Sequence, residues 1–216
     1  MDSIIRWGLN FFEILACVTG FVYWSKWRHS YWKWFPVYLA VIVLVELTGK
    51  YLWLNENIEL NISLYKYFGI PVQFLFYFWL FNKYFRSYKE NKWPAIGAAI
   101  YIISALVDVI YLNKEKFWFS SFSYMVGNII LVVLIMIFLI RMTASGDLLE
   151  YKTNLMFWVC IGLLIFYLGT LPFYGLRNYL FAEYHEVFRK YWYIQFGFGY
   201  LMYISFVIGF VCSRQR

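Results

Sequence analysis

The sequence has few of the residues that carry chemistry in soluble enzymes. It contains two histidines and three cysteines, and charged residues make up 14% of its 216 positions, where soluble domains carry about 25%. His29 and His185 lie far apart in separate polar stretches and cannot supply the clustered ligands of an intramembrane zinc site. No phosphate-binding glycine loop is present. These absences predict no metal or other cofactor and give no support for an enzyme.

Apolar surface is what the chain has in abundance. Hydrophobic residues make up 63% of the sequence and aromatic residues 25%, more than a water-soluble core of this size could bury. Cys17, Cys160 and Cys212 all fall in apolar stretches, which predicts packing roles rather than disulfides. The composition therefore excludes a soluble domain and predicts an integral membrane protein.

Seven mostly apolar runs approach the roughly 20 residues that a helix needs to cross a bilayer. They cover residues 8–24, 36–54, 64–81, 94–112, 118–140, 154–176 and 192–212. The first run starts next to Asp2 and Arg6 and lacks the cleavage site of a signal peptide, so we expect it to be retained. Because the intervening loops are short, we expect one all-α bundle of seven transmembrane helices, covering residues 1–216.

The basic residues predict how this bundle is oriented. Eleven of the 19 lie in loops on one side, namely Lys26, Arg28, Lys33, Lys83, Arg86, Lys89, Lys92, Arg141, Lys152, Arg214 and Arg216. Six lie on the other side, namely Arg6, Lys114, Lys116, Arg177, Arg189 and Lys190. The positive-inside rule then places the N-terminus outside and the C-terminus in the cytoplasm. Cations scattered over short loops suit membrane lipids rather than nucleic acid.

Polar side chains inside the spans concentrate in the half of the bilayer predicted to be outer. Such residues are costly in a membrane and usually face the bundle interior. Small or polar neighbours at helical spacing support this direction for Asp108. It shares a face with Gly97, Tyr101 and Ser104. The candidate residues are Glu13, Glu46, Lys50, Lys66, Gln73, Asp108, Asn128, Tyr174, Arg177 and Gln195.

Two interpretations of this polar layer remain open. In the first it is structural, with Glu46 and Lys50 paired at i, i+4 and Asp108 meeting Lys66 or Arg177. In the second it lines a cavity that opens outward and orients a small polar or zwitterionic ligand.

Two prolines and one outer segment bear on how such a site would work. Pro71 and Pro172 fall within the third and sixth runs, where proline is expected to kink a helix, either for packing or as a hinge. Residues 178–190 have apolar positions at helical spacing, which predicts a short amphipathic helix on the outer surface. That helix would serve as a connector or cover the cavity.

Several short aromatic stretches resemble a loose group of small bacterial seven-helix membrane proteins of unassigned function. They are Tyr67-Phe-Gly-Ile-Pro-Val-Gln-Phe74, Phe122-Ser-Tyr-Met-Val-Gly-Asn128, Phe157-Trp158 with Gly162, and the ending around Tyr203 and Cys212. The resemblance implies a bacterial inner (cytoplasmic) membrane and no mechanism.

The leading hypothesis is a receptor-like or sensory protein that binds a small polar ligand in the outward-facing cavity. It would signal through a partner protein or a homo-oligomer, with Pro71 and Pro172 passing the change inward. One alternative is an oligomeric membrane effector or channel, for example in a stress or defence system. Such a protein would have polar residues through the inner half or a polar stripe on an outward helix face, and neither is evident. A small secondary transporter ranks third, because the chain shows no convincing internal repeat.

Overall fold

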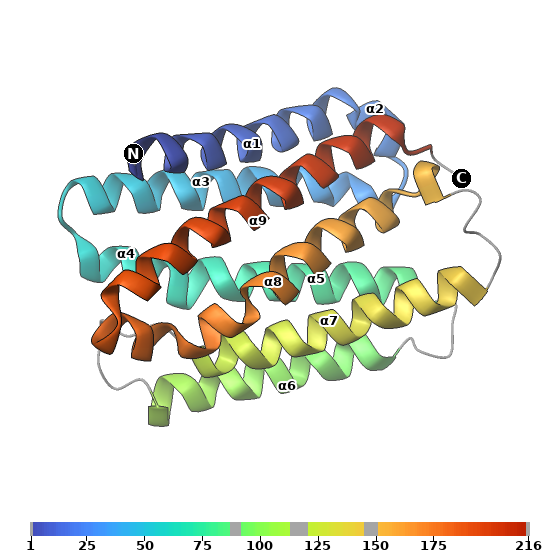
Figure 1. The fold of residues 1–216 in the computed structure, drawn as a ribbon. Helices are drawn as coiled ribbons and strands as arrows, with labels where there is room; N and C mark the ends of the chain where they lie inside the picture. The colour runs from blue at the N-terminus through green and yellow to red at the C-terminus, as the bar shows by residue number, and fades with distance from the viewer. Residues whose placement is uncertain (1, 87–91, 113–120, 145–150, 215–216) are drawn as a thin grey trace. The chain divides into compact units, whose positions relative to one another are not determined.

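The computed structural model describes residues 2–86, 92–112, 121–144 and 151–214 (Figure 1). Over these ranges the regular structure is helical and contains no strand. Five helices there are long and apolar enough to cross a membrane: Tyr31–Leu54, Trp93–Tyr111, Phe122–Ala144, Leu155–Glu183 and His185–Cys212. The chain is therefore an all-α membrane protein. The predicted loop positions of Lys89, Lys114, Lys116 and Arg216, and the start of the 118–140 run, lie outside the described residues.

The helices follow one another with short connections. In chain order they are α1 (Asp2–Val22), α2 (Trp24–Trp27), the 3-10 helix η1 (Tyr31–Lys33), α3 (Trp34–Leu54), α4 (Ile58–Leu64), the π-helix η2 (Tyr65–Gly69), α5 (Ile70–Phe85), α6 (Trp93–Val107), the π-helix η4 (Asp108–Leu112), α7 (Ser121–Ala144), α8 (Leu155–Glu183) and α9 (His185–Cys212). The run predicted at 64–81 thus begins earlier, at Ile58, and contains a π-helical turn.

The separate surface helix predicted at residues 178–190 is wrong. α8 continues to Glu183 and α9 starts at His185, so Tyr184 alone separates them. Backbone hydrogen bonds bridge this residue, from Tyr184 N–H to the Leu180 carbonyl and from Phe188 N–H to the Tyr184 carbonyl, both at 2.9 Å. Residues 176–183 hold no glycine or proline that would end a helix, so α8 runs on.

Contacts divide the chain into two compact units. Unit 1 comprises Met1–Val43, Ile135–Thr170 and Lys190–Arg216. Close helix packing in unit 1 depends on glycine: a Cβ on Gly20 of α1 would lie 2.9 Å from Pro36 of α3, and one on Gly162 of α8 would lie 3.0 Å from the Met202 carbonyl of α9. Small residues of this kind let membrane helices approach each other.

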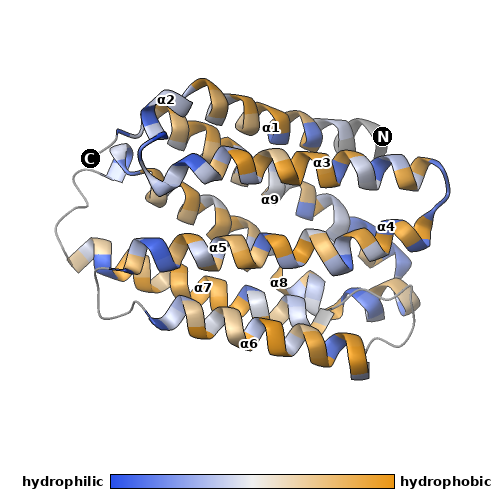
Figure 2. Ribbon diagram, turned by 180° about the vertical axis from the view of Figure 1, so that it is seen from behind, coloured by the Kyte–Doolittle hydropathy of each residue, from blue (hydrophilic) through white to orange (hydrophobic). Residues whose placement is uncertain are grey.

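Unit 2 comprises Leu44–Leu134 and Leu171–Arg189. Its core is aromatic. The ring of Phe74 on α5 lies 5.0 Å from that of Tyr101 on α6 and 5.3 Å from that of Tyr124 on α7, centroid to centroid. α5 and α6 run side by side in opposite directions (Figures 1 and 2). The hydrophilic residues of this unit include the turn from α3 to α4, which Figure 2 shows in blue.

That turn ends α3 in a Schellman motif. Asn57 N–H donates to the Leu52 carbonyl at 2.9 Å and Glu56 N–H donates to the Trp53 carbonyl at 3.1 Å. The motif places Glu56 in the left-handed region, with φ of 60°. Glycine usually occupies this position because a Cβ there is strained.

Replacing Glu56 with glycine should therefore stabilise unit 2. Relief of the left-handed strain, less the greater entropy of glycine in the unfolded chain, leaves a gain of about 0.5–1 kcal/mol. The measurement is the unfolding temperature of the protein in detergent. Glu56→Ala is the matched control, because alanine removes the same charge but keeps the strained Cβ. Equal stabilisation by both variants would show that charge, not backbone strain, is responsible.

Candidate functional site

The two units share the ten candidate residues unequally. Glu13 and Gln195 belong to unit 1, and the other eight, together with Pro71 and Pro172, belong to unit 2. In unit 1, Glu13 is buried on the face of α1 that also carries Ala16 and Gly20, and Gln195 is half-buried in α9. Most of the candidate residues therefore lie in unit 2.

Asp108 acts as a helix cap in this structure. It is 1% exposed and stands at the start of η4. Its Oδ2 accepts hydrogen bonds from the backbone N–H of Ser123 at 3.0 Å and from the Ser123 hydroxyl at 2.7 Å. Ser123 lies in the first turn of α7, whose N–H groups have no partner within the helix and whose dipole favours a negative charge. The geometry supports a structural role for this carboxylate.

Glu46 ties α3 to the helices that follow it. Its Oε2 accepts a hydrogen bond from the Tyr65 hydroxyl at 2.8 Å, and the Asn61 side-chain amide donates to the Gly49 carbonyl. Tyr65 lies so close to Gly49 that a Cβ there would be 2.5 Å from the tyrosine oxygen. These contacts join α3, α4 and η2. The ion pair between Glu46 and Lys50 stays a prediction.

A ladder of rings connects α5, α7 and α8. The rings of Tyr124 and Tyr174 are tilted by 33° with their centroids 4.1 Å apart, and the guanidinium of Arg177 lies 5.5 Å from the Tyr174 ring centroid. One turn after Tyr124, Asn128 is fully buried. The arrangement fills the space between these helices with π-surface and holds Arg177 as a cation over a ring.

Lys66 differs from the other charged candidates. It is 7% exposed, yet in the described part of the chain its ammonium makes a cation–π interaction with the ring of Tyr67, 5.4 Å from the ring centroid, and no hydrogen bond or ion pair. Of the two partners considered for Asp108, Lys66 is thus wrong, and Arg177 stays a prediction. Gln73, seven residues further along the chain and beyond the π-turn that holds Lys66, is half-buried and also has no hydrogen-bond partner among the described residues.

The backbone around Lys66 is unusual as well. η2 is π-helical, with Ile70 N–H donating to the Tyr65 carbonyl five residues earlier. Pro71 explains this local geometry, because proline has no N–H to complete the α-helical bond to the Tyr67 carbonyl. Single π-turns within α-helices are frequently found at functional sites. Pro172, by contrast, lies inside α8 with an exposed side chain.

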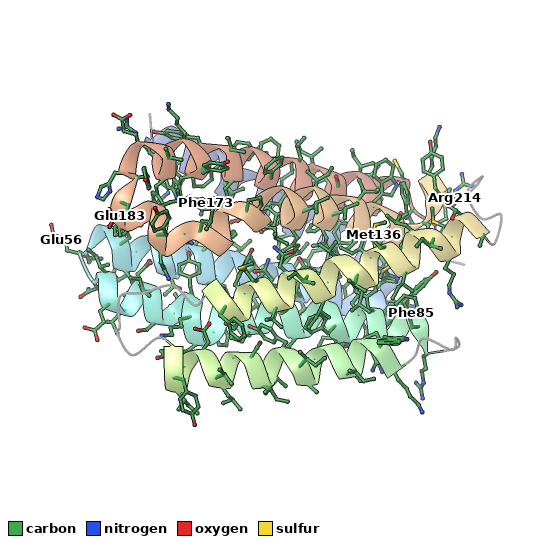
Figure 3. The ribbon with its side chains drawn as sticks, turned by 60° about the horizontal axis from the view of Figure 1, so that its bottom comes forward. Glu56, Phe85, Met136, Phe173, Glu183 and Arg214 are labelled. Atoms are coloured by element: carbon green, nitrogen blue, oxygen red, sulfur yellow. The ribbon has the colours of Figure 1, made fainter. Side chains whose placement is uncertain are left out.

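Helix register places Lys66 and Asp108 at one depth of unit 2. The Phe74–Tyr101 contact aligns the antiparallel α5 and α6. Lys66 precedes Phe74 by eight residues, which is about 12 Å along the helix axis, and Asp108 follows Tyr101 by seven residues, about 10 Å. Because the two helices are antiparallel, both steps lead in the same direction. This direction leads to the end where Figure 3 shows Glu56 and Glu183, with Phe85 at the opposite end. Lys66 therefore lies near the acidic end of unit 2.

The partners of the acids were missed by sequence reasoning. Ser123 and Tyr65 hold Asp108 and Glu46, and a serine near a helix start was the available signal for the first. Among the described residues no group of three or more His, Cys, Asp and Glu side chains could hold a metal. The chain matches no protein-family model, no curated protein and no solved structure.

Proposed function

We propose that the protein is a receptor-like membrane protein that binds a small polar ligand through the ammonium of Lys66. In this proposal the chain spans a bacterial inner membrane seven times with its N-terminus outside. The observation that carries the proposal is that Lys66 is nearly buried without an anionic partner in the described chain. An unpaired charge in such surroundings costs several kcal/mol, so the position favours a bound anionic group.

The chemistry around Lys66 defines what the ligand must carry. An ammonium offers three donors and suits a carboxylate or a phosphate. Gln73 follows the same π-turn, and its amide can donate to or accept from a second polar group. Four exposed acids, Glu56, Glu59, Glu183 and Glu186, belong to the same unit and disfavour a highly charged anion. A small zwitterion or monoanion fits these conditions best.

The π-helical turn offers a route by which binding could be transmitted. Lys66 lies inside the turn and Pro71 is the second residue after it, so a force on the ammonium acts on the backbone that leads into α5. The Tyr65 hydroxyl, in the same turn, holds Glu46 of α3. In our proposal, ligand binding shifts this turn, and the change reaches a partner protein or a second copy of the chain.

Lys66→Met tests the proposal. Methionine keeps the length of the side chain but removes the charge, so the variant should unfold at a higher temperature than the parent protein, because replacing a buried charge with an apolar group is often stabilising. Acetate, glycine and inorganic phosphate would be added separately to the protein in lipid nanodiscs. We expect at least one of them to raise the unfolding temperature of the parent protein and none to raise that of Lys66→Met.

Two further variants complete this experiment. Lys66→Arg keeps the charge and should retain part of the response, whereas Lys83→Gln removes a cation elsewhere in unit 2 and should respond like the parent protein. A Lys66→Met variant that unfolds at a lower temperature, with no response of the parent protein to any of the three compounds, would contradict the proposal. Lys66 would then serve the fold alone.

A further inference from the structure

The end of unit 1 formed by α2 and the last turn of α9 holds several cations close together. Lys26 Nζ donates to the carbonyl of Phe210 at 3.5 Å, which joins α2 to α9. Arg214 N–H donates to the Thr153 carbonyl at 2.9 Å, which fixes the chain after α9 beside Lys152. In unit 1 the described acids are Asp2 and Glu13, both in α1, and none lies on these segments.

Among the residues of unit 1 that the structure describes, no carboxylate pairs with Lys26. Partial burial lowers the pKa of Lys26; the nearby Cys212 thiol acts in the opposite direction, and the positive charge of Arg214 lowers the pKa further. Two like charges held near each other are destabilising unless an anion lies between them. The segment therefore has the electrostatics of an anion site.

Two buried polar groups at the same end also lack partners. Trp27 Nε1 and Ser213 Oγ belong to side chains that are 3% and 0% exposed, and neither has a hydrogen-bond partner in the part of the chain that the structure describes. Trp27 adjoins Lys26, and Ser213 adjoins Arg214. A buried donor without a partner costs about 1–3 kcal/mol, which a bound acceptor would offset.

From these groups we infer that this end of unit 1 binds the phosphate of an anionic phospholipid headgroup. Lys26 and Arg214 supply the charge, and small movements of Trp27 and Ser213 let the indole N–H and the hydroxyl donate to phosphate oxygens. Aromatic residues flank the site, since Trp32 packs against Phe35 and Trp34 is exposed, as is typical of the lipid interface. The inference is independent of the ligand proposed for Lys66.

The test uses the full chain in nanodiscs made of phosphatidylcholine alone or of phosphatidylcholine with phosphatidylglycerol. After transfer to detergent, native mass spectrometry counts the lipids that remain bound. We expect the parent protein to retain one phosphatidylglycerol in preference to phosphatidylcholine. Lys26→Gln and Arg214→Gln should each weaken that preference about fivefold, the effect of one cation near an anionic lipid.

Three control variants distinguish a specific binding site from general electrostatic attraction between the cations and anionic lipid. Trp27→Phe keeps the ring but removes the N–H, so it should reduce retention of phosphatidylglycerol without changing retention of phosphatidylcholine. Lys26→Arg should keep the preference, and Lys83→Gln, in unit 2, should not change it. Equal losses in Lys83→Gln and Lys26→Gln would overturn the inference, as would equal retention of the two lipids by the parent protein.

Inorganic phosphate shows whether the site binds the phosphate of a lipid headgroup or free phosphate from solution. If it displaces phosphatidylglycerol from the parent protein and stabilises delipidated protein equally well, the site takes soluble phosphate and the lipid assignment is wrong. If it does neither at the same concentration, the headgroup assignment stands.

Discussion

Asp108→Ala is expected to lower the free energy of unfolding by about 3 kcal/mol. The substitution leaves the Ser123 N–H and hydroxyl without their acceptor at a buried position and removes the negative charge at the start of α7. The measurement is an unfolding titration with sodium dodecyl sulfate in mixed micelles, followed by tryptophan fluorescence. The same variant should retain any stabilisation by acetate, glycine or phosphate that the parent protein shows.

Two milder variants test whether this loss of stability comes from the hydrogen bonds between Asp108 and Ser123. Asp108→Asn keeps an acceptor for both donors and should lose less than alanine does. Ser123→Ala removes the hydroxyl but leaves the backbone N–H bonded, so a loss of about 1 kcal/mol is expected. An Asp108→Ala variant as stable as the parent protein, with a lost response to ligand, would instead place Asp108 in the binding site and return the polar layer to its functional interpretation.

Gly127→Ala is expected to cost about 2 kcal/mol. Its Cβ would lie 2.9 Å from the ring of Tyr101 and 3.1 Å from two atoms of Phe74, and both rings are buried in the core of unit 2. Overpacking of this kind typically costs about 1–3 kcal/mol, and it must also exceed the gain of about 1 kcal/mol that alanine brings to a helix. The same detergent titration measures the loss.

The chain supplies a matched control for this prediction. Gly197 of α9 has no atom within 4 Å of the place where a Cβ would stand, so Gly197→Ala should be neutral or stabilising. Phe74→Leu in the Gly127→Ala background should recover part of the loss, because a smaller side chain makes room for the methyl group. Equal effects of the two glycine substitutions would show that helix propensity, not crowding, governs both sites.

The sequence predicted helix faces better than it predicted partners. The residues on the face of Asp108, Gly97, Tyr101 and Ser104, are all buried, because a period of 3.6 residues is enough to place side chains on one side of a helix. Which group on another helix meets Asp108 depends on how the helices pack, and no periodicity contains that information. The pairing of Lys66 with Asp108 was wrong for this reason.

The sequence also predicted the ends of the helices poorly. The amphipathic pattern of residues 178–190 is real, but the same pattern also fits the end of one long helix and the start of the next, and no residue between 176 and 183 stops α8. The π-turn at Tyr65–Gly69 could have been suspected from Pro71, which removes one backbone donor, but proline at this position is equally compatible with a kink. The apolar pattern determines where helices lie more firmly than where they start, stop or change pitch.

The π-turn also has a bearing on how sequences of this type should be aligned. A turn closed by bonds between residues five apart holds one residue more than an α-helical turn, so the chain around Tyr65–Gly69 carries one residue in excess of a regular helix. A homologue lacking one residue here could form an unbroken α-helix and still present every later side chain of α5 on its present face. A one-residue gap at this point preserves the fold, whereas the same gap in the middle of α5 rotates all that follows by about 100°.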